Sequence, residues 1–128
     1  MAGVDVELEV QHNLPAVYGD EGVLRQAFLN LLRNAIQASP RGSAPIRMCA
    51  ELTGGVVELT VADRGIGIPA EVQSKVFDLY YTSRKEGTGV GLSQAQQAIE
   101  MHGGTISFQS SPATGTVFRV RLPALTTA

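Results

Sequence analysis

The chain has 128 residues, 44% of them hydrophobic, which is enough for the core of one domain. Ten Lys and Arg residues against twelve Asp and Glu give a net charge of −2, which argues against a nucleic-acid-binding surface. The single cysteine, Cys49, excludes a disulfide framework and a cysteine-based zinc site. No apolar run reaches the roughly 18–20 residues of a membrane span. Glycine is the enriched residue, with 14 copies, so its positions guide the search for a site.

Hydrophobic periodicity, caps and turn residues predict strands and helices along the whole chain. In chain order we expect a strand over 4–10, a helix over 20–38, strands over 46–52 and 57–61, a short helix over 69–77, a polar loop over 78–89, a helix over 90–102, and strands over 106–108 and 118–122. Asp20 is the expected N-cap of the first helix, and Leu29 belongs to the apolar side of that helix. Gly54-Gly55 is the expected hairpin turn, and Gly103-Gly104 is the expected C-terminal cap of the last helix. The alternating strands, each with one exposed face and one face buried against the helices, indicate a mixed, mostly antiparallel sheet packed against about three helices, an α/β sandwich of two layers.

Two asparagines lie one turn apart in the first long helix, at the border of its apolar face. Helix propensity explains Asn30 and Asn34 poorly, because asparagine is a weak helix former. They are either caps for a neighbouring loop or a pair of oxygen donors that face a cleft. Carbonyl oxygens suit a hard cation such as Mg²⁺, which keeps several water and phosphate ligands.

The first glycine motif, Asp63-Arg64-Gly65-Ile66-Gly67, follows the strand over 57–61. Its spacing to Ala70 satisfies a loose dinucleotide-binding pattern, but the parallel strand–helix–strand unit of such sites is not predicted here. A carboxylate before a flexible Gly-x-Gly turn can instead accept a hydrogen bond from an amino group such as that of adenine. The plain alternative is a strand-to-helix turn.

The second glycine motif, Gly87-Thr88-Gly89-Val90-Gly91, opens the helix over 90–102. Backbone N–H groups converge in such a motif and the helix N-terminus adds partial positive charge, so the motif favours phosphate. Arg84 and Lys85 lie just upstream, either as phosphate contacts or as solvated loop residues. The P-loop pattern is absent.

Taken in order, four segments resemble the motifs of a known family. They are Asn30-Leu31-Leu32-Arg33-Asn34-Ala35 (N box), Asp63-Arg64-Gly65-Ile66-Gly67 (G1 box), Phe77-Asp78-Leu79-Tyr80-Tyr81-Thr82-Ser83 (F box) and Gly87-Thr88-Gly89-Val90-Gly91-Leu92 (G2 box). From about Val4 to Pro123 the chain resembles the catalytic ATP-binding (HATPase_c) domain of a two-component sensor histidine kinase, most closely the nitrogen-regulation (NtrB) type. The resemblance implies the Bergerat α/β sandwich of the superfamily that includes gyrase, heat-shock chaperones, histidine kinases and MutL.

The resemblance also implies a role for each matching residue. Asn34 would ligate a Mg²⁺ that bridges the phosphates of ATP, with Asn30 beside it as the second catalytic residue. Asp63 would bind the adenine amino group, with Thr116 assisting through water. The remaining nucleotide contacts would come from Gly65, Gly67, Arg84, Lys85, Gly87, Thr88, Gly89, Gly91 and Leu92. Residues 78–89 would form the ATP lid, anchored by Phe77.

Asn30 distinguishes a kinase from hydrolytic members of the superfamily. Gyrase-like and chaperone relatives carry a glutamate at this position that activates water, and asparagine cannot act as a general base. The resemblance therefore implies slow ATP hydrolysis and transfer of the γ-phosphoryl group to a histidine. The alternatives are a superfamily ATPase, an anti-sigma serine kinase and a non-catalytic adenine nucleotide-binding module.

The chain departs from the family pattern at two places. Gln37 stands where many sensor kinases have a lysine, and Tyr80-Tyr81 replaces a pair of phenylalanines. Arg84 aligns with the lysine of the usual Thr-Thr-Lys segment. Arg84, Lys85 and the metal would then balance the charge of the phosphates.

We expect the phosphoacceptor histidine and its dimerisation domain to be absent from this sequence. Neither His12 nor His102 is followed by the acidic residue usual at a phosphoacceptor, and no helical hairpin precedes them. The expected partners are ATP, a histidine-bearing dimerisation domain of the same kinase, and a downstream response regulator. Residues 1–128 are expected to form one monomeric domain in the cytoplasm, from a parent protein that is soluble or membrane-anchored.

Overall fold

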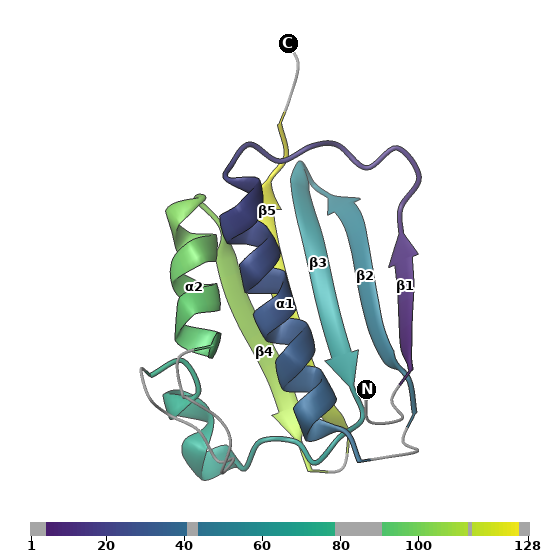
Figure 1. Cartoon of the computed structure of the whole chain (residues 1–128), viewed down its shortest axis with the longest axis vertical. Helices are drawn as coiled ribbons and strands as arrows, with labels where there is room; N and C mark the ends of the chain where they lie inside the picture. Colours follow the sequence, from purple (N-terminus) through teal and green to yellow (C-terminus); the bar gives the residue numbers. More distant parts are fainter. Residues whose placement is uncertain (1–4, 41–43, 79–90, 113, 126–128) are drawn as a thin grey trace.

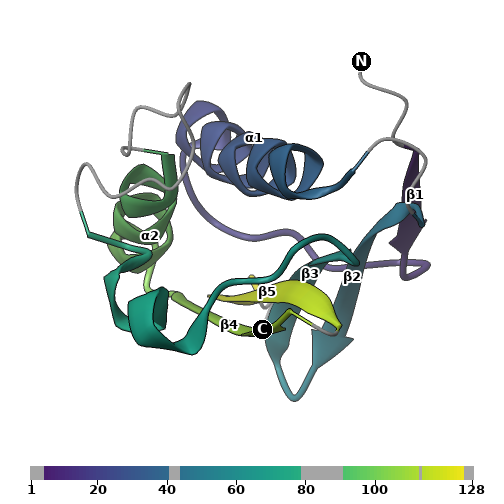
Figure 2. The ribbon, with the colours of Figure 1, turned by 90° about the horizontal axis from the view of Figure 1, so that it is seen from below.

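The computed structural model describes residues 5–40, 44–78, 91–112 and 114–125. A five-stranded sheet carries helices on one face, as Figure 1 shows. The elements are β1 (Val6–Val10), α1 (Glu21–Ala38), β2 (Ile46–Thr53), β3 (Val56–Asp63), the 3₁₀ helix η1 (Ala70–Lys75), α2 (Gly91–Met101), β4 (Thr105–Ser111) and β5 (Gly115–Pro123). Seen from below, α1 and α2 form one layer and the strands the other (Figure 2). The predicted α/β sandwich is confirmed.

The sheet has the strand order β1-β2-β3-β5-β4. Only the β1–β2 pair is parallel, and the other three pairs in this described sheet are antiparallel. The mixed, mostly antiparallel arrangement is therefore as predicted. Because β3 is antiparallel to both of its neighbours, the first glycine motif does not belong to a parallel dinucleotide-binding unit.

Local sequence signals place the long elements well. The Asp20 side chain accepts a hydrogen bond from the backbone N–H of Val23 at 3.0 Å and so caps α1. Gly54 and Gly55 have φ values of 57° and 81°, the left-handed conformation that a two-residue hairpin turn requires at both central positions. Gly103, at φ 75°, follows the end of α2 as the expected C-terminal cap.

The core lies between α1, α2 and the middle of the sheet. Its buried hydrophobic residues are Ala27, Leu31, Ala35, Ile46, Val61, Ala95, Ala98, Ile99, Phe118, Val120 and Leu122. The three residues from α1 follow one another at intervals of four, which keeps them on one side of a helix. Small alanines on both helices let α1 and α2 pack closely side by side above the sheet.

Two predictions about which side chains are buried were wrong. The strand over 4–10 was expected to have a buried face, but Val6, Leu8 and Val10 are 38%, 68% and 53% exposed. Leu29, assigned to the apolar side of the first helix, is 43% exposed. The cause is the position of the helices, because α1 packs on β3 and α2 on β4 while β1 stands at the edge of the sheet (Figures 1 and 2).

The short helix expected over 69–77 is a 3₁₀ helix of six residues, Ala70–Lys75. Pro69 precedes it and contributes no side-chain cap, and so short a segment favours the tighter helix. None of the helices in the described ranges is both long and apolar enough to cross a membrane.

Candidate functional site

Asp63 and Thr116 face each other across the β3–β5 pair, at the end of β3. Their exposed fractions are only 3% and 2%. The Asp63 carboxylate accepts the backbone N–H of Gly65 at 2.8 Å, which orients one of its oxygens. Sheet pairing therefore brings together the two residues that the family resemblance assigns to adenine.

The glycines of the first motif let the chain pass close to its own backbone. A Cβ atom on Gly65 would collide with the carbonyl oxygen of Ala38, the last residue of α1. Gly67 has a φ of 72°, and a Cβ atom there would collide with the carbonyl oxygen of Ser111. The N–H of Ile66 donates to the same Ala38 oxygen at 3.1 Å. The motif thus ties the end of α1 to the loop after β3.

Ser110 links this loop to the sheet and was missed by sequence analysis. Its hydroxyl accepts the N–H of Ile68 at 2.8 Å and lies 2.7 Å from the hydroxyl of Thr116. The side-chain amide of Gln73 donates to the carbonyl oxygens of Ile68 and Ser110 at 2.9 and 3.1 Å. Extending the alternation of Ile106 and Phe108 by one step would have identified Ser110. The sequence offers no comparable signal for Gln73.

Asn30 is buried in α1, with only 7% of its surface exposed. At this border of the apolar face, α2 begins beside Asn30. A Cβ atom built on Gly91 would lie 3.8 Å from the Asn30 Cγ. The Asn30 oxygen accepts the side-chain N–H of Gln26 at 3.2 Å, a partner within α1 itself. Asn34, one turn later, is half-buried.

The first turn of α2 carries the described part of the second glycine motif. Gly91 starts the helix, and Leu92 packs against the hydrophobic core. The backbone N–H groups of a first helical turn have no partner within the helix and favour an anion. Five further expected contacts, Arg84, Lys85, Gly87, Thr88 and Gly89, lie outside the described residues, as does the expected lid over 78–89 except for Asp78.

Three aromatic rings pack at the point where the chain leaves η1. Phe77, the expected lid anchor, meets Phe108 edge-on with ring centroids 5.8 Å apart and Phe118 at 6.2 Å. Phe108 and Phe118 are 5.5 Å apart in turn. Edge-to-face contacts of this kind add to the burial of apolar surface. These contacts hold the ring of Phe77, the expected lid anchor, against β4 and β5.

The side chains of the candidate site decide whether it suits the expected Mg²⁺ ion. Within the described ranges, no three His, Cys, Asp or Glu side chains gather into a metal-binding cluster. The oxygen donors expected to hold the ion are the side-chain carboxamides of Asn30 and Asn34 in α1. The Asn30 oxygen already accepts a hydrogen bond from Gln26. Mg²⁺ is often held by one or two protein oxygens, with phosphates and water completing its shell. The residues therefore fit a Mg²⁺ ion that arrives with a nucleotide.

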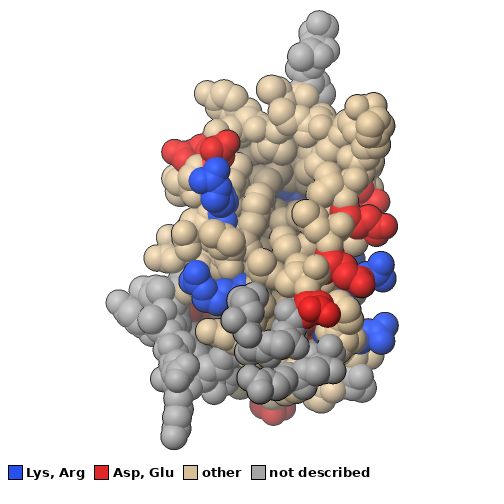
Figure 3. Space-filling model, turned by 45° about the vertical axis from the view of Figure 1, so that its right-hand side comes forward, with Lys and Arg blue, Asp and Glu red and all other residues tan. Residues whose placement is uncertain are grey.

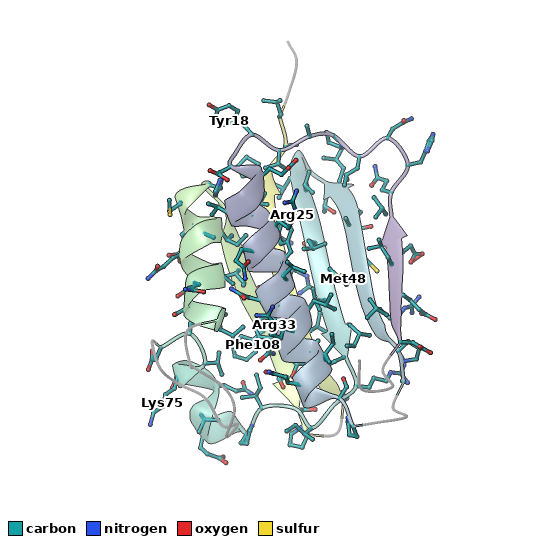
Figure 4. All side chains as sticks on the ribbon, viewed as in Figure 1. Tyr18, Arg25, Arg33, Met48, Lys75 and Phe108 are labelled. Carbon is teal, nitrogen blue, oxygen red and sulfur yellow. The ribbon has the colours of Figure 1, made fainter. Side chains whose placement is uncertain are left out.

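A separate hollow of about 550 Å³ lies between α1 and the β2 side of the sheet. Its lining includes Leu24, Arg25, Phe28 and Leu32 of α1 and Met48 of β2. Figure 3 shows uncharged surface in the middle of this face and charged side chains at its sides, and Figure 4 shows Arg25, Arg33 and Met48 from the front. Of the expected nucleotide-binding residues that the structure describes, none lines this hollow.

The two histidines differ in their surroundings. His12 is exposed before α1. His102 has its Nε2 3.0 Å from the N–H of Asp20, which it accepts, and its Nδ1 2.7 Å from the carbonyl oxygen of Ala98, to which it donates. Both ring nitrogens of His102 are therefore engaged within the domain.

The chain matches proteins of known type along most of its length. Residues 19–126 match the family model described as "Histidine kinase-, DNA gyrase B-, and HSP90-like ATPase". Sporulation kinase B of Bacillus subtilis is 39% identical over 94% of this chain and 28% of the relative. The sensory histidine kinase/phosphatase NtrB of Azospirillum brasilense is 38% identical over 87% of this chain and 31% of the relative. The chain thus spans about a third of the length of these relatives.

Solved structures agree with the sequence matches. The mycobacterial sensor histidine kinase MprB superposes with a TM-score of 0.84 and 29% identity, over 98% of this chain and 85% of that one. Full-length ShkA, solved in complex with AMPPNP, gives a TM-score of 0.84 and 27% identity, over 99% of this chain and 27% of that one. The chain therefore belongs to the histidine kinase-, DNA gyrase B- and HSP90-like ATPase family, and its resemblance to the catalytic ATP-binding domain of a sensor histidine kinase is confirmed.

Proposed function

We propose that this domain binds ATP with Mg²⁺ and donates the γ-phosphoryl group to a histidine on a separate dimerisation domain. The observation that carries the proposal is the buried pair of Asp63 and Thr116, which lies at the end of the β3–β5 pair. The N–H of Gly65 donates to this carboxylate at 2.8 Å and so orients it. The exocyclic amino group of adenine is a donor that an oriented carboxylate can also accept. The similarity to ShkA, a protein solved with the ATP analogue AMPPNP, supports the same ligand class.

The phosphates would extend from this end of the sheet toward the first turn of α2. There the helix dipole and the N–H groups that have no partner within the helix favour negative charge. Asn34 would hold the Mg²⁺ ion, which when bound neutralises charge on the phosphates. We assign the remaining phosphate contacts to Gly91, to Leu92 through its backbone, and to Arg84, Lys85, Gly87, Thr88 and Gly89.

Positioning and charge neutralisation would carry the transfer, since phosphoryl transfer needs little covalent help from the protein. Asn30 occupies the place where hydrolytic relatives have a glutamate, and a carboxamide cannot take a proton from water. We therefore expect the γ-phosphoryl group to persist until a histidine imidazole attacks it, displacing ADP. We place this reaction in the cytoplasm, where ATP is abundant, with a response regulator as the downstream acceptor and the isolated domain as a monomer.

The test has two steps. Calorimetric titration with ATP, with and without Mg²⁺, measures binding. Incubation with γ-labelled ATP and a separately expressed histidine-bearing hairpin of the same kinase then measures acid-labile phosphohistidine. We expect tight Mg²⁺-dependent binding, labelled hairpin and slow ATP hydrolysis by the domain alone.

Two results would favour other functions. Sustained steady-state ATP hydrolysis by this chain alone would favour a superfamily ATPase, and acid-stable phosphoserine on a protein substrate would favour an anti-sigma type of kinase. Tight ATP binding with no phosphohistidine on the hairpin would favour a nucleotide-binding module that transfers nothing.

A further inference from the structure

Three polar side chains form one row across the end of the sheet. The register pairs Asp63 of β3 with Thr116 of β5, and Thr116 in turn with Ser110 of β4. Directly paired residues of neighbouring strands point to the same face of a sheet, so all three share one face. The next row on this face is apolar and belongs to or packs against the core: Val61, Phe118 and Phe108. The polar row therefore borders the core where β3 ends and β5 begins (Figure 1).

The Ser110 hydroxyl lies between the loop after β3 and Thr116. It accepts the backbone N–H of Ile68 at 2.8 Å, and its oxygen lies 2.7 Å from the hydroxyl oxygen of Thr116. The side-chain amide of Gln73 donates to the carbonyl oxygens of Ile68 and Ser110 at 2.9 and 3.1 Å, which holds the same two segments together. Ser110 is thus fixed in place from the side of the loop.

The hydrogen bond from Ile68 favours Ser110 as the donor of the Ser110–Thr116 pair. A serine hydroxyl has one proton to donate and two lone pairs, and the Ile68 N–H occupies one of those lone pairs. Among the groups that the structure describes, the Thr116 oxygen lies 2.7 Å away and can take the Ser110 proton. The Thr116 proton is then left for another acceptor. Thr116 is only 2% exposed, so bulk water does not compete for this hydroxyl.

Adenine offers an acceptor of the matching kind. If Asp63 accepts the amino group of adenine, a ring nitrogen lies on each side of that group, N1 and N7, and both accept hydrogen bonds. The Asp63 carboxylate cannot serve such a nitrogen, because an ionised carboxylate only accepts. A Thr116 hydroxyl that donates, directly or through one bound water, supplies the missing donor beside Asp63.

We propose that Ser110 is a positioning residue that donates its proton to Thr116 and so keeps the Thr116 hydroxyl directed, as a donor, at a ring nitrogen of bound adenine. The inference rests on the proposed function, because it takes an adenine nucleotide as the ligand. Ser110 acts through Thr116 and does not itself touch the nucleotide. The pair selects a base that carries an acceptor beside its amino group.

Ser110→Ala removes the proton donor and leaves the Thr116 hydroxyl free to rotate. We expect ATP affinity to fall about three- to tenfold, the value of one neutral hydrogen bond, as measured by calorimetric titration. Ser110→Thr keeps the hydroxyl on a residue that suits a strand, and it should retain ATP affinity within about twofold. Because Ser110→Ala also deprives the Ile68 N–H of its acceptor, the loss of affinity alone does not separate positioning from a structural role.

Deaza analogues of ATP separate these two roles. In 1-deaza-ATP and 7-deaza-ATP a carbon replaces one ring nitrogen, so the analogue accepts no hydrogen bond at that position. We expect the loss caused by Ser110→Ala to be nearly absent for one analogue, because the contact is already missing in its complex with the wild type. The loss should persist for the other analogue. A purely structural role would lower the affinity for ATP and both analogues equally.

Thr116→Val tests whether Ser110 acts through Thr116, since valine keeps the branched shape but has no hydroxyl. In a Thr116→Val chain, Ser110→Ala should cause little further loss of ATP affinity, because the group that Ser110 positions is gone. Ser111→Ala is the matched control. It removes a hydroxyl from the next residue of β4, which lies 2.7 Å from the Thr114 hydroxyl instead, and it should leave ATP affinity unchanged.

The outcomes distinguish the inference from the function beneath it. An equal loss for ATP and both deaza analogues in Ser110→Ala, or no loss for any of them, would overturn the inference and leave the proposed function standing. Fully additive losses in the double variant of Ser110→Ala and Thr116→Val would likewise reject it. No ATP binding by the wild-type chain would overturn both.

Discussion

Asp63 is a carboxylate held in a nearly water-free place by the backbone around it. Its exposed fraction is 3%, and the N–H of Gly65 fixes one of its oxygens. Asp63→Asn keeps the size and the hydrogen bond to Gly65 but removes the charge and adds an NH₂ group that opposes the amino group of adenine. We expect ATP and ADP affinity to fall roughly 10- to 100-fold, the value of a hydrogen bond to a charged group. Calorimetry measures the change.

Glu100→Gln is the matched control for Asp63→Asn, because it removes the same charge from an exposed position on α2. It should leave nucleotide affinity unchanged. An Asp63→Asn variant that binds ATP as tightly as Glu100→Gln would reject the adenine assignment.

Asn34 is expected to bind Mg²⁺ and not the adenine ring. Asn34→Ala removes a carboxamide oxygen from the half-buried side of α1 while keeping a good helix former. We expect the gain in ATP affinity that Mg²⁺ produces to shrink several-fold, with affinity in EDTA little changed. Titrations in both conditions measure this difference. An undiminished Mg²⁺ effect would show that the metal is held by phosphates and other groups alone.

His102 connects two elements that are far apart in the sequence. Its ring accepts the N–H of Asp20 at the start of α1 and donates to Ala98 at the end of α2. His102→Ala removes both hydrogen bonds and leaves the Asp20 N–H unpaired. We expect the free energy of unfolding in urea to fall by about 1–3 kcal/mol.

His12→Ala provides the comparison for this prediction, since His12 is exposed and should change stability little. Equal stability of the two variants would mean that water replaces the His102 hydrogen bonds without cost. Neither substitution should reduce phosphotransfer to a separate hairpin, because neither histidine is the expected phosphoacceptor.

The elements that sequence analysis predicted best are those with strong local signals. The Asp20 cap, the Gly54-Gly55 turn and the four-residue spacing of buried residues along α1 each act over a few residues, so a single sequence contains them. Asp63 was a candidate from its place before the Gly-x-Gly turn, and Thr116 was assigned only through the family resemblance. The antiparallel β3–β5 register explains why they lie together. That register is a long-range property.

Other features depend on packing that no local pattern encodes. Asn30 lies at the border of the apolar face on a helical wheel, and its burial beside the start of α2 is a tertiary feature. The alternation along β4 puts Ser110 on the same face as Ile106 and Phe108, but its hydrogen bond to Ile68 depends on how the loop after β3 packs on the sheet. The exposure of Val6, Leu8 and Val10 follows from which strands the helices cover. Each outcome required the relative placement of two distant segments.

In the whole molecule, the helix layer covers some strands of the sheet and leaves β1 exposed. α1 packs on β3 and α2 on β4, while β1 forms the edge of the sheet with all five residues exposed and pairs with β2 alone (Figure 1). β3 and β5 instead pair on both sides and supply Val61, Phe118, Val120 and Leu122 to the core. Local opening costs least where few apolar contacts are broken, so stability should rise from β1 toward the centre of the sheet.

Native-state hydrogen exchange tests this gradient strand by strand. We expect the hydrogen-bonded amides of β3 and β5 to exchange only by global unfolding, with a free energy equal to that from urea denaturation. The paired amides of β1 should open with a free energy several kcal/mol lower, and their exchange should be insensitive to small amounts of urea because little surface is exposed. ATP should slow exchange at the end of β3 and the start of α2, where the proposed site lies, more than in β1. Equal protection of β1 and β3 would mean that the edge strand opens only with the whole domain.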